Sequence, residues 1–137
     1  MWWIFALLSA LFASLTAILA KVGIKGIDTN LALAIRTSFI LLLTWGIVIA
    51  TGATRGITTL NKSNLLFLLL SGVTTGLSWL FYFKALDMGK LSQVAPVDKL
   101  SIALTILLSV VILKETVDVK TLIGALLIVG GTLVIIL

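Results

Sequence analysis

Long apolar runs that carry almost no charge are the feature that most restricts how this chain can fold. Of its 137 residues, 61% are hydrophobic and 11% are charged, whereas a soluble domain is about half apolar and about one quarter charged. A segment that crosses hydrocarbon must satisfy its own backbone hydrogen bonds, as a helix or within a closed barrel. The runs are continuous and lack the strict alternation of barrel strands. The sequence therefore predicts an all-α integral membrane protein.

Five of these runs approach or exceed the length needed to cross a bilayer, and polar or glycine-containing turns separate them. The first is expected to be a retained span and not a cleaved signal, because no Lys or Arg precedes it. Asp28 is expected to cap the second helix, and residues 51–63 to form a polar loop. We expect one transmembrane domain over residues 1–137, with spans at about 2–20, 31–50, 64–84, 91–113 and 119–137.

The composition excludes several classes of function. The chain has no Cys and no His, which removes the usual zinc sites, thiol nucleophiles and histidine-based triads. No nucleophile–base pair is visible, so we expect neither an enzyme nor a bound metal or cofactor. The net charge of +5 is spread between long apolar runs, so a lipid bilayer, and no nucleic acid, is the expected partner.

Three charged residues lie inside the predicted spans and away from the span ends: Arg36, Asp98 and Lys99. Each costs several kcal/mol if it faces lipid, so each is expected to face the bundle interior or to reach the interface. All three lie about two turns in from span ends on the same side of the membrane. Arg36 is the first choice as partner of Asp98, because a guanidinium can pair bidentately with a carboxylate.

Two helical faces carry polar side chains that are suited to a cavity wall. Asp98, Ser101, Thr105 and Ser109 follow helical spacing along one face of the fourth span. Lys99 is rotated about 100° from that face, so it either joins the site or extends to the interface. On the third span the polar and aromatic residues include Thr75, Trp79 and Tyr82, although Tyr82 also fits an interfacial aromatic belt. The candidate substrate-binding residues are Arg36, Thr75, Trp79, Tyr82, Asp98, Lys99, Ser101 and Thr105.

Two further features are open to more than one interpretation. Pro96 removes a backbone hydrogen bond beside Asp98, which either leaves a carbonyl for a ligand or only bends the helix. Small residues at helical spacing indicate close helix approach, within the chain in the commoner case or across a dimer seam. These are Ser9, Ala13 and Ala17, then Gly72 and Gly76, and finally Gly124 and Gly131.

The Lys and Arg residues of the loops and span ends divide evenly between the two sides of the membrane. One side carries Arg55, Lys62, Lys114 and Lys120, and the other carries Lys21, Lys25, Lys84 and Lys90. Because the bias in these residues sets orientation, the chain either inserts both ways or favours one orientation by a small margin. Insertion both ways would permit an antiparallel homodimer with the symmetry of an inverted-repeat transporter.

The stretch Val94-Ala95-Pro96-Val97-Asp98-Lys99-Leu100-Ser101, followed by Leu113-Lys114-Glu115, resembles the fourth-helix signature of EamA-type members of the drug/metabolite transporter superfamily. Residues 20–23, 34–37 and 76–82 fit the same pattern, so the resemblance covers the whole chain. More narrowly, the chain resembles the short, single-repeat, five-helix bacterial and archaeal forms of this family. Lys114 stands where the family more often has Gly.

This resemblance implies one half of a ten-helix inverted-repeat transporter in the cell inner membrane. We expect a secondary transporter, exporter or exchanger, of a small polar metabolite that works as an antiparallel homodimer by alternating access. Four cations (Lys21, Arg36, Lys84 and Lys99) against one embedded acid favour an anionic or zwitterionic substrate. The alternative is a structural or accessory subunit that docks another membrane protein.

Overall fold

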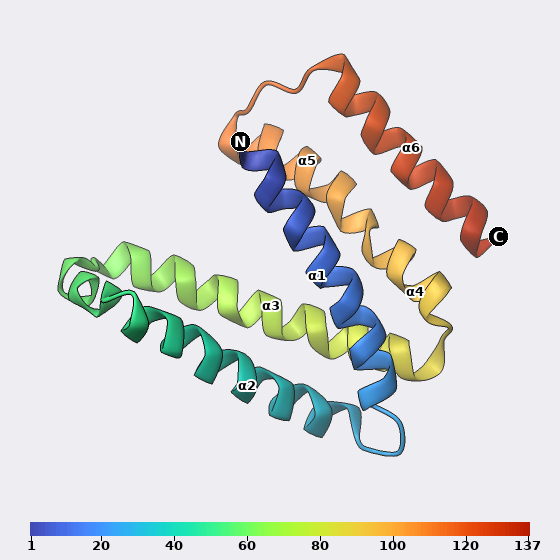
Figure 1. Cartoon of the computed structure of the whole chain (residues 1–137). Helices are drawn as coiled ribbons and strands as arrows, with labels where there is room; N and C mark the ends of the chain where they lie inside the picture. Colours follow the sequence, from blue (N-terminus) through green and yellow to red (C-terminus); the bar gives the residue numbers. More distant parts are fainter. The chain divides into compact units, whose positions relative to one another are not determined.

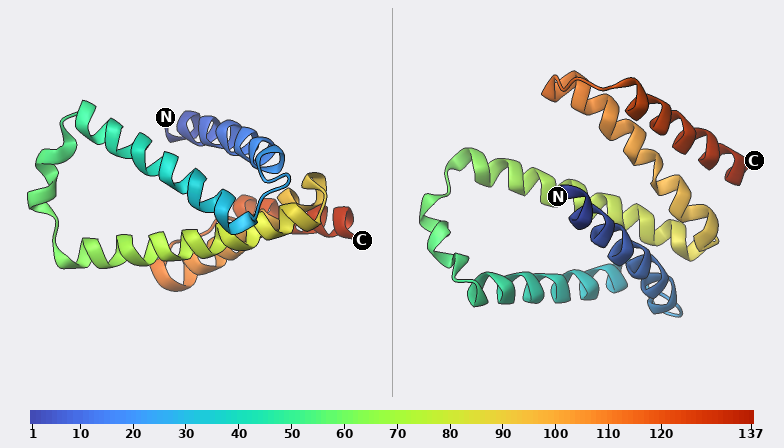
Figure 2. Two further views of the ribbon diagram at one scale, coloured as in Figure 1. Left: turned by 90° about the horizontal axis from the view of Figure 1, so that it is seen from below. Right: turned by 45° about the horizontal axis from the view of Figure 1, so that its top comes forward.

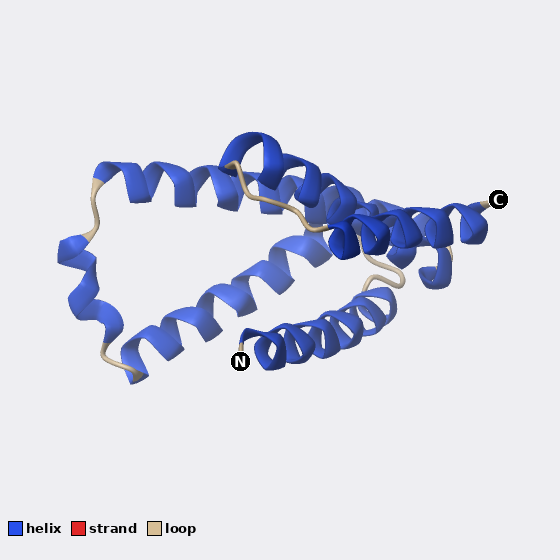
Figure 3. Ribbon diagram, turned by 90° about the horizontal axis from the view of Figure 1, so that it is seen from above, coloured by secondary structure: helices blue, strands red, loops and turns tan.

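The computed structural model describes all residues from 1 to 137, and every regular element in it is helical (Figure 1). Short loops join the helices (Figure 3). The elements in chain order are α1 (Trp2–Gly23), α2 (Thr29–Ala50), the short 3₁₀ helix η1 (Ala53–Thr59), α3 (Lys62–Met88), α4 (Leu91–Asp98), α5 (Leu100–Leu113) and α6 (Val119–Ile136).

Five segments are long and apolar enough to cross a membrane, which confirms the expected number of spans. They coincide with α1, α2, α3, the combined α4 and α5, and α6. Few side chains are buried within the chain, and most large aliphatic and aromatic side chains are exposed. Such a surface is unfavourable in water but is the expected lipid-facing surface of a helical membrane protein.

The chain divides into two compact units. The first contains residues 1–17 and 88–137, and the second contains residues 18–87. In the first unit α6 packs along both α4 and α5 (Figure 1). In the second unit the chain runs along α2, turns through η1 and returns along α3 (Figure 2). The single transmembrane domain over residues 1–137 stays a prediction.

The fourth span, predicted over 91–113 with a bend or a freed carbonyl at Pro96, is divided at Lys99. Pro96 lies inside α4, and its carbonyl accepts hydrogen bonds from the Lys99 amide at 3.1 Å and from the hydroxyl of Thr132 on α6 at 3.3 Å. An α-helix would use that carbonyl for the amide four residues later. The bond three residues later therefore marks the break, while the Thr132 hydroxyl makes its shorter hydrogen bond, at 2.8 Å, to the Ile128 carbonyl of its own helix.

Side-chain caps begin two of the helices. The carboxylate of Asp28 accepts from the amides of Asn30 at 2.9 Å and Leu31 at 3.1 Å, which confirms the predicted cap of α2. Asp118 caps α6 in the same way. The predicted polar loop over 51–63 contains η1, which follows Gly52 in a left-handed conformation (φ 70°).

Lys114 ends α5 in a left-handed conformation, with φ 54° and ψ 32°. The amides of Lys114 and Glu115 both donate to the Ser109 carbonyl, so the tight turn forms without a glycine. A side chain in this conformation costs roughly 1–2 kcal/mol, which glycine avoids.

We expect Lys114→Gly to raise the free energy of unfolding by about 1 kcal/mol, measured by thermal denaturation in detergent. Lys114→Ala removes the same charge without relieving φ, and an equal gain in that control would contradict the explanation.

Asp118 lies outside the membrane-spanning segments, where hydrogen bonds from the Thr121 hydroxyl and amide lower the pKa of its carboxyl below the usual value. Its charged form therefore adds stability at neutral pH, and this contribution is lost as the pH falls through the folded-state pKa. Asp118→Asn keeps an acceptor for the cap but does not titrate. We expect the difference in thermal midpoint between the native chain and Asp118→Asn to shrink as the pH falls below about 4. A constant difference would contradict a titrating cap.

Candidate functional site

Arg36 of α2 lies against the ring of Trp79 of α3. Its guanidinium carbon is 3.7 Å from the Trp79 ring centroid, within the range of a cation–π interaction. Within its unit the guanidinium donates no hydrogen bond and pairs with no carboxylate. A guanidinium has five N–H donors in its plane, and stacking leaves the edge of that plane open. Arg36 is therefore a partly desolvated cation with free donors inside a span.

Two more rings extend this contact along α3. Tyr82 meets Trp79 edge-on, with ring centroids 5.3 Å apart and planes at 82°. Phe83 is 5.8 Å from Trp79 and lies 5.9 Å from the Arg36 guanidinium carbon. Phe83 is almost completely buried and was not among the predicted site residues. The sequence feature that could have identified Phe83 is its position four residues after Trp79, which places both rings on one helical face.

The ends of α1 and α3 are joined near these rings. The Lys21 ammonium donates a hydrogen bond to the Leu86 carbonyl, in the last turn of α3. Carbonyls there lack helical partners and carry the negative end of the helix dipole, so a cation stabilises them. The sequence identified Lys21 as a cation at a span end and as one of four that favour an anionic or zwitterionic substrate. Its role at the end of α3 depends on the packing of α1 in this unit.

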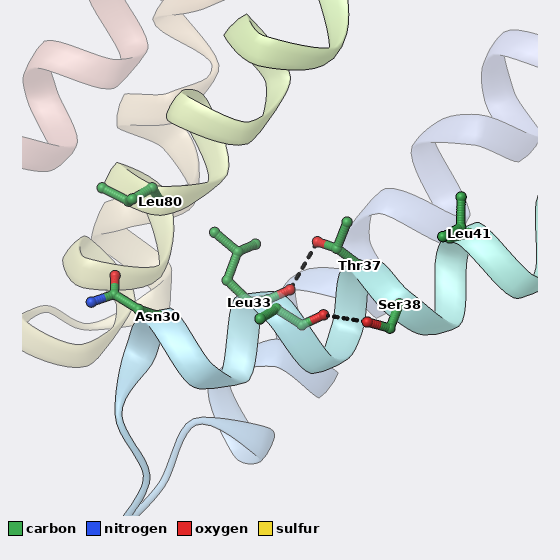
Figure 4. A pocket seen from close by; sticks show the side chains of 7 residues that line it. Asn30, Leu33, Thr37, Ser38, Leu41 and Leu80 are labelled. Atoms are coloured by element: carbon green, nitrogen blue, oxygen red, sulfur yellow. Dashed lines mark hydrogen bonds between the residues drawn. The ribbon is translucent and has the colours of Figure 1, made fainter.

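An open pocket of about 430 Å³ in the same unit is lined by six residues of α2 and by one residue of α3, Leu80. Figure 4 shows Leu80 of α3 opposite a row of side chains on α2. Thr37 and Ser38 donate their hydroxyl protons to the Leu33 and Ala34 carbonyls, at 2.8 and 3.0 Å. The lining is therefore mainly aliphatic, and it comprises Asn30, Leu33, Ala34, Thr37, Ser38, Leu41 and Leu80.

The remaining candidates pair locally. Asp98 forms an ion pair with Lys99 at 3.3 Å, and both side chains retain exposed surface. Whether Lys99 joins a substrate site or extends to the interface stays a prediction. The Thr105 hydroxyl donates to the Ser101 carbonyl of its own helix at 2.8 Å. The Thr75 hydroxyl donates in the same way to the Ser71 carbonyl, also at 2.8 Å.

The predicted residues therefore fall into two groups. Arg36, Trp79 and Tyr82 come together in the unit of residues 18–87, where Thr75 lies one turn before Trp79. The other group, in the unit that contains α4 to α6, comprises Asp98, Lys99, Ser101 and Thr105. Pairing between Arg36 and Asp98 would join the two units, and it stays a prediction.

Removing the Trp79 ring tests the cation–π contact. We expect Trp79→Leu to lower the free energy of unfolding by about 1 kcal/mol more than Trp79→Phe, because Phe retains an aromatic face for Arg36. The measurement is thermal unfolding of the purified chain in detergent. Trp45→Leu is the matched control, since Trp45 on α2 is half-exposed and has no ring contact. An equal loss in Trp79→Leu and Trp79→Phe would contradict a contribution from the stack.

The comparisons with known proteins cover the whole chain. Residues 1–137 match the model of the EamA-like transporter family. A Sinorhizobium protein described as "Uncharacterized transporter in cobO 3'region" is 43% identical over 134 residues, which cover 98% of this chain and 95% of that protein. No solved structure is a significant match. With five membrane-competent helices, the chain is a multi-pass inner-membrane transporter, and it belongs to the EamA-like transporter family.

Proposed function

We propose that the chain is a secondary transporter of a small metabolite with an anionic or zwitterionic group, and that two antiparallel copies work together by alternating access. The observation that carries the substrate class is the Arg36 guanidinium, stacked at 3.7 Å on Trp79 with its donors unused. Keeping a cation inside a span is costly unless it has a partner or a function. A carboxylate or phosphate oxygen pair fits the free edge of the guanidinium.

The placement of the rings supports a binding role for this arginine. Trp79 and Phe83 occupy the space beside the guanidinium, so the side chain has less freedom to reach the interface. A donor that is already oriented and partly desolvated binds an anion with a smaller loss of entropy.

Open glycine faces support the homodimer. A Cβ built on Gly72, Gly76, Gly124 or Gly131 meets no neighbouring atom within 4 Å. Such faces permit close approach of another membrane helix, and a second copy supplies five more helices. Two antiparallel copies then have the symmetry on which alternating access between inverted repeats depends.

Uptake into proteoliposomes tests the proposed substrate class. The purified full-length chain is reconstituted, and counterflow is measured for matched anionic, zwitterionic and cationic amines and acids of similar size. We expect counterflow for the anionic and zwitterionic compounds and none above empty liposomes for the cations. A preference for cations would overturn the proposed substrate class and would leave family membership intact.

A further inference from the structure

The covered surface of α3 is confined to the last turns of this long helix. Every residue of α3 before Trp79 is exposed in the chain, whereas Phe83 is 2% exposed and Leu86 is fully buried. Trp79, Phe83 and Leu86 are separated by four and three residues, so they lie on one helical face. This face is therefore the part of α3 by which the helix is held in its unit.

Lys21 fixes the same end of α3 to α1. Its ammonium donates to the Leu86 carbonyl, in a turn whose carbonyls lack helical partners. Because lipid is as apolar as the helices, the hydrophobic effect does not set the rotation of α3 about its axis. The two buried side chains, Phe83 and Leu86, and the bond from Lys21 therefore set it.

The rotation of α3 decides whether Arg36 keeps its aromatic surface. The Phe83 ring lies 5.8 Å from the Trp79 ring, with the planes 60° apart, and Trp79 in turn stacks on the Arg36 guanidinium. Phe83 has almost no surface for a ligand to contact, so its influence reaches an anion only through Trp79 and Arg36.

Loss of either Phe83 or the Lys21 bond has the same consequence for the guanidinium. Without Phe83 the indole of Trp79 gains room to turn. Without the bond from Lys21 the end of α3 gains freedom to rotate. In both cases the Arg36 side chain is released from the ring and extends toward the interface, as long cationic side chains do.

We propose that Lys21 and Phe83 are positioning residues for the anion site, because they fix the rotation of α3 that keeps Trp79 against Arg36. The inference rests on the proposed function, since it needs an anion at the guanidinium. It adds that Lys21 acts through the end of α3 and not by its charge. It also adds that Phe83 sets the affinity of the site without touching the substrate.

The chain has two arginines, Arg36 and Arg55, which permits a direct test of the stack. The full-length chain is prepared with ¹⁵N-labelled arginine in nanodiscs, and the Nε–H resonance of Arg36 is identified by its absence from Arg36→Gln. The ring current of Trp79 shifts this resonance, so its position reports the stack without any ligand. We expect Lys21→Gln and Phe83→Leu to move it toward the position of the Arg55 resonance.

Titration of the same samples with inorganic phosphate measures the anion site. Ordering one flexible side chain weakens binding by a factor of about two to ten, so we expect phosphate to bind about two- to tenfold more weakly to both variants. Lys25→Gln and Phe81→Leu are the matched controls, because Lys25 is an exposed cation near Lys21 and Phe81 is 66% exposed on α3. Both controls should keep the native resonance and the native affinity.

Lys21→Arg distinguishes positioning from a simple loss of charge or fold. It keeps a donor for the Leu86 carbonyl, so it should retain the native resonance and affinity. If Phe83→Leu does not fold, Lys21→Gln and Lys21→Arg carry the test.

The inference and the proposed function fail in different ways. A native resonance and affinity in Lys21→Gln and Phe83→Leu would overturn the inference alone, and so would an equal loss of affinity in Lys25→Gln. A native Arg36 resonance that does not respond to phosphate would overturn the proposed function as well.

Discussion

Replacement of Arg36 by Gln is expected to weaken substrate binding by about 100-fold while leaving the fold intact. A bidentate, charge-assisted contact contributes about 3 kcal/mol, which corresponds to a factor of about 100 in the dissociation constant. The cation is only partly covered by Trp79 and has no ion-pair partner within its unit. Gln removes a costly charge from the span but also the stack on Trp79, so we expect a loss of stability of no more than about 1 kcal/mol.

Arg36→Lys separates the charge from the geometry of the guanidinium. Lysine keeps a positive charge but lacks the planar fork and stacks less well on an aromatic ring, so we expect an intermediate loss. Arg55→Gln is the matched control, because Arg55 lies in η1 outside the spans. Substrate dissociation constants and thermal midpoints are measured for all four proteins. A large loss of midpoint in Arg36→Gln would indicate a structural role, and unchanged binding would exclude Arg36 from the site.

The second large effect concerns orientation. The chain has no native cysteine, so Trp2→Cys and Leu137→Cys each report on one terminus. In intact cells treated with a membrane-impermeant thiol reagent, we expect about half of each protein to be labelled, because the loop cations are evenly divided. Lysis before labelling gives the full signal for comparison.

A charge-shift variant provides the control for that experiment. Two additional lysines in the loop between α2 and α3, at Thr58 and Thr59, should drive most of the chain into one orientation. Labelling of Trp2→Cys should then approach all or none, and transport should fall because antiparallel pairs become rare. Labelling of one terminus alone in the native chain would exclude an antiparallel homodimer and would require a partner chain of opposite orientation.

The number and nature of the spans were predictable because hydropathy and length are local properties. The cap at Asp28 was also predictable, since a carboxylate two residues before Asn30 has a short-range acceptor role in any helix that starts there. For the fourth span the sequence indicated a bend or a freed carbonyl at Pro96, but not that the helix divides at Lys99. The contact of the Pro96 carbonyl with Thr132, which lies 36 residues later in sequence, depends on how α6 packs on α4.

The candidate site also has a part that was predictable from the sequence and a part that depends on the tertiary structure. The sequence identified Arg36 and Trp79 as candidates, because a charge and an indole inside spans are unusual, and its first choice of Asp98 as the partner of Arg36 stays a prediction. Several cations and acids lie at a similar depth, and depth alone does not select a partner. The choice of Trp79, the burial of Phe83 and the pocket at Leu80 depend on how α2 and α3 are rotated about their axes.

The sequence by itself determined that this is an all-helical, five-span transporter of its family, because membrane insertion depends on the hydropathy of each segment taken alone. Only the tertiary structure decided what each polar side chain contacts. Lipid is as apolar as the helices, so the hydrophobic effect does not specify their rotation. Packing and a few polar contacts, such as Lys21 with the Leu86 carbonyl and Arg36 with Trp79, decide it instead.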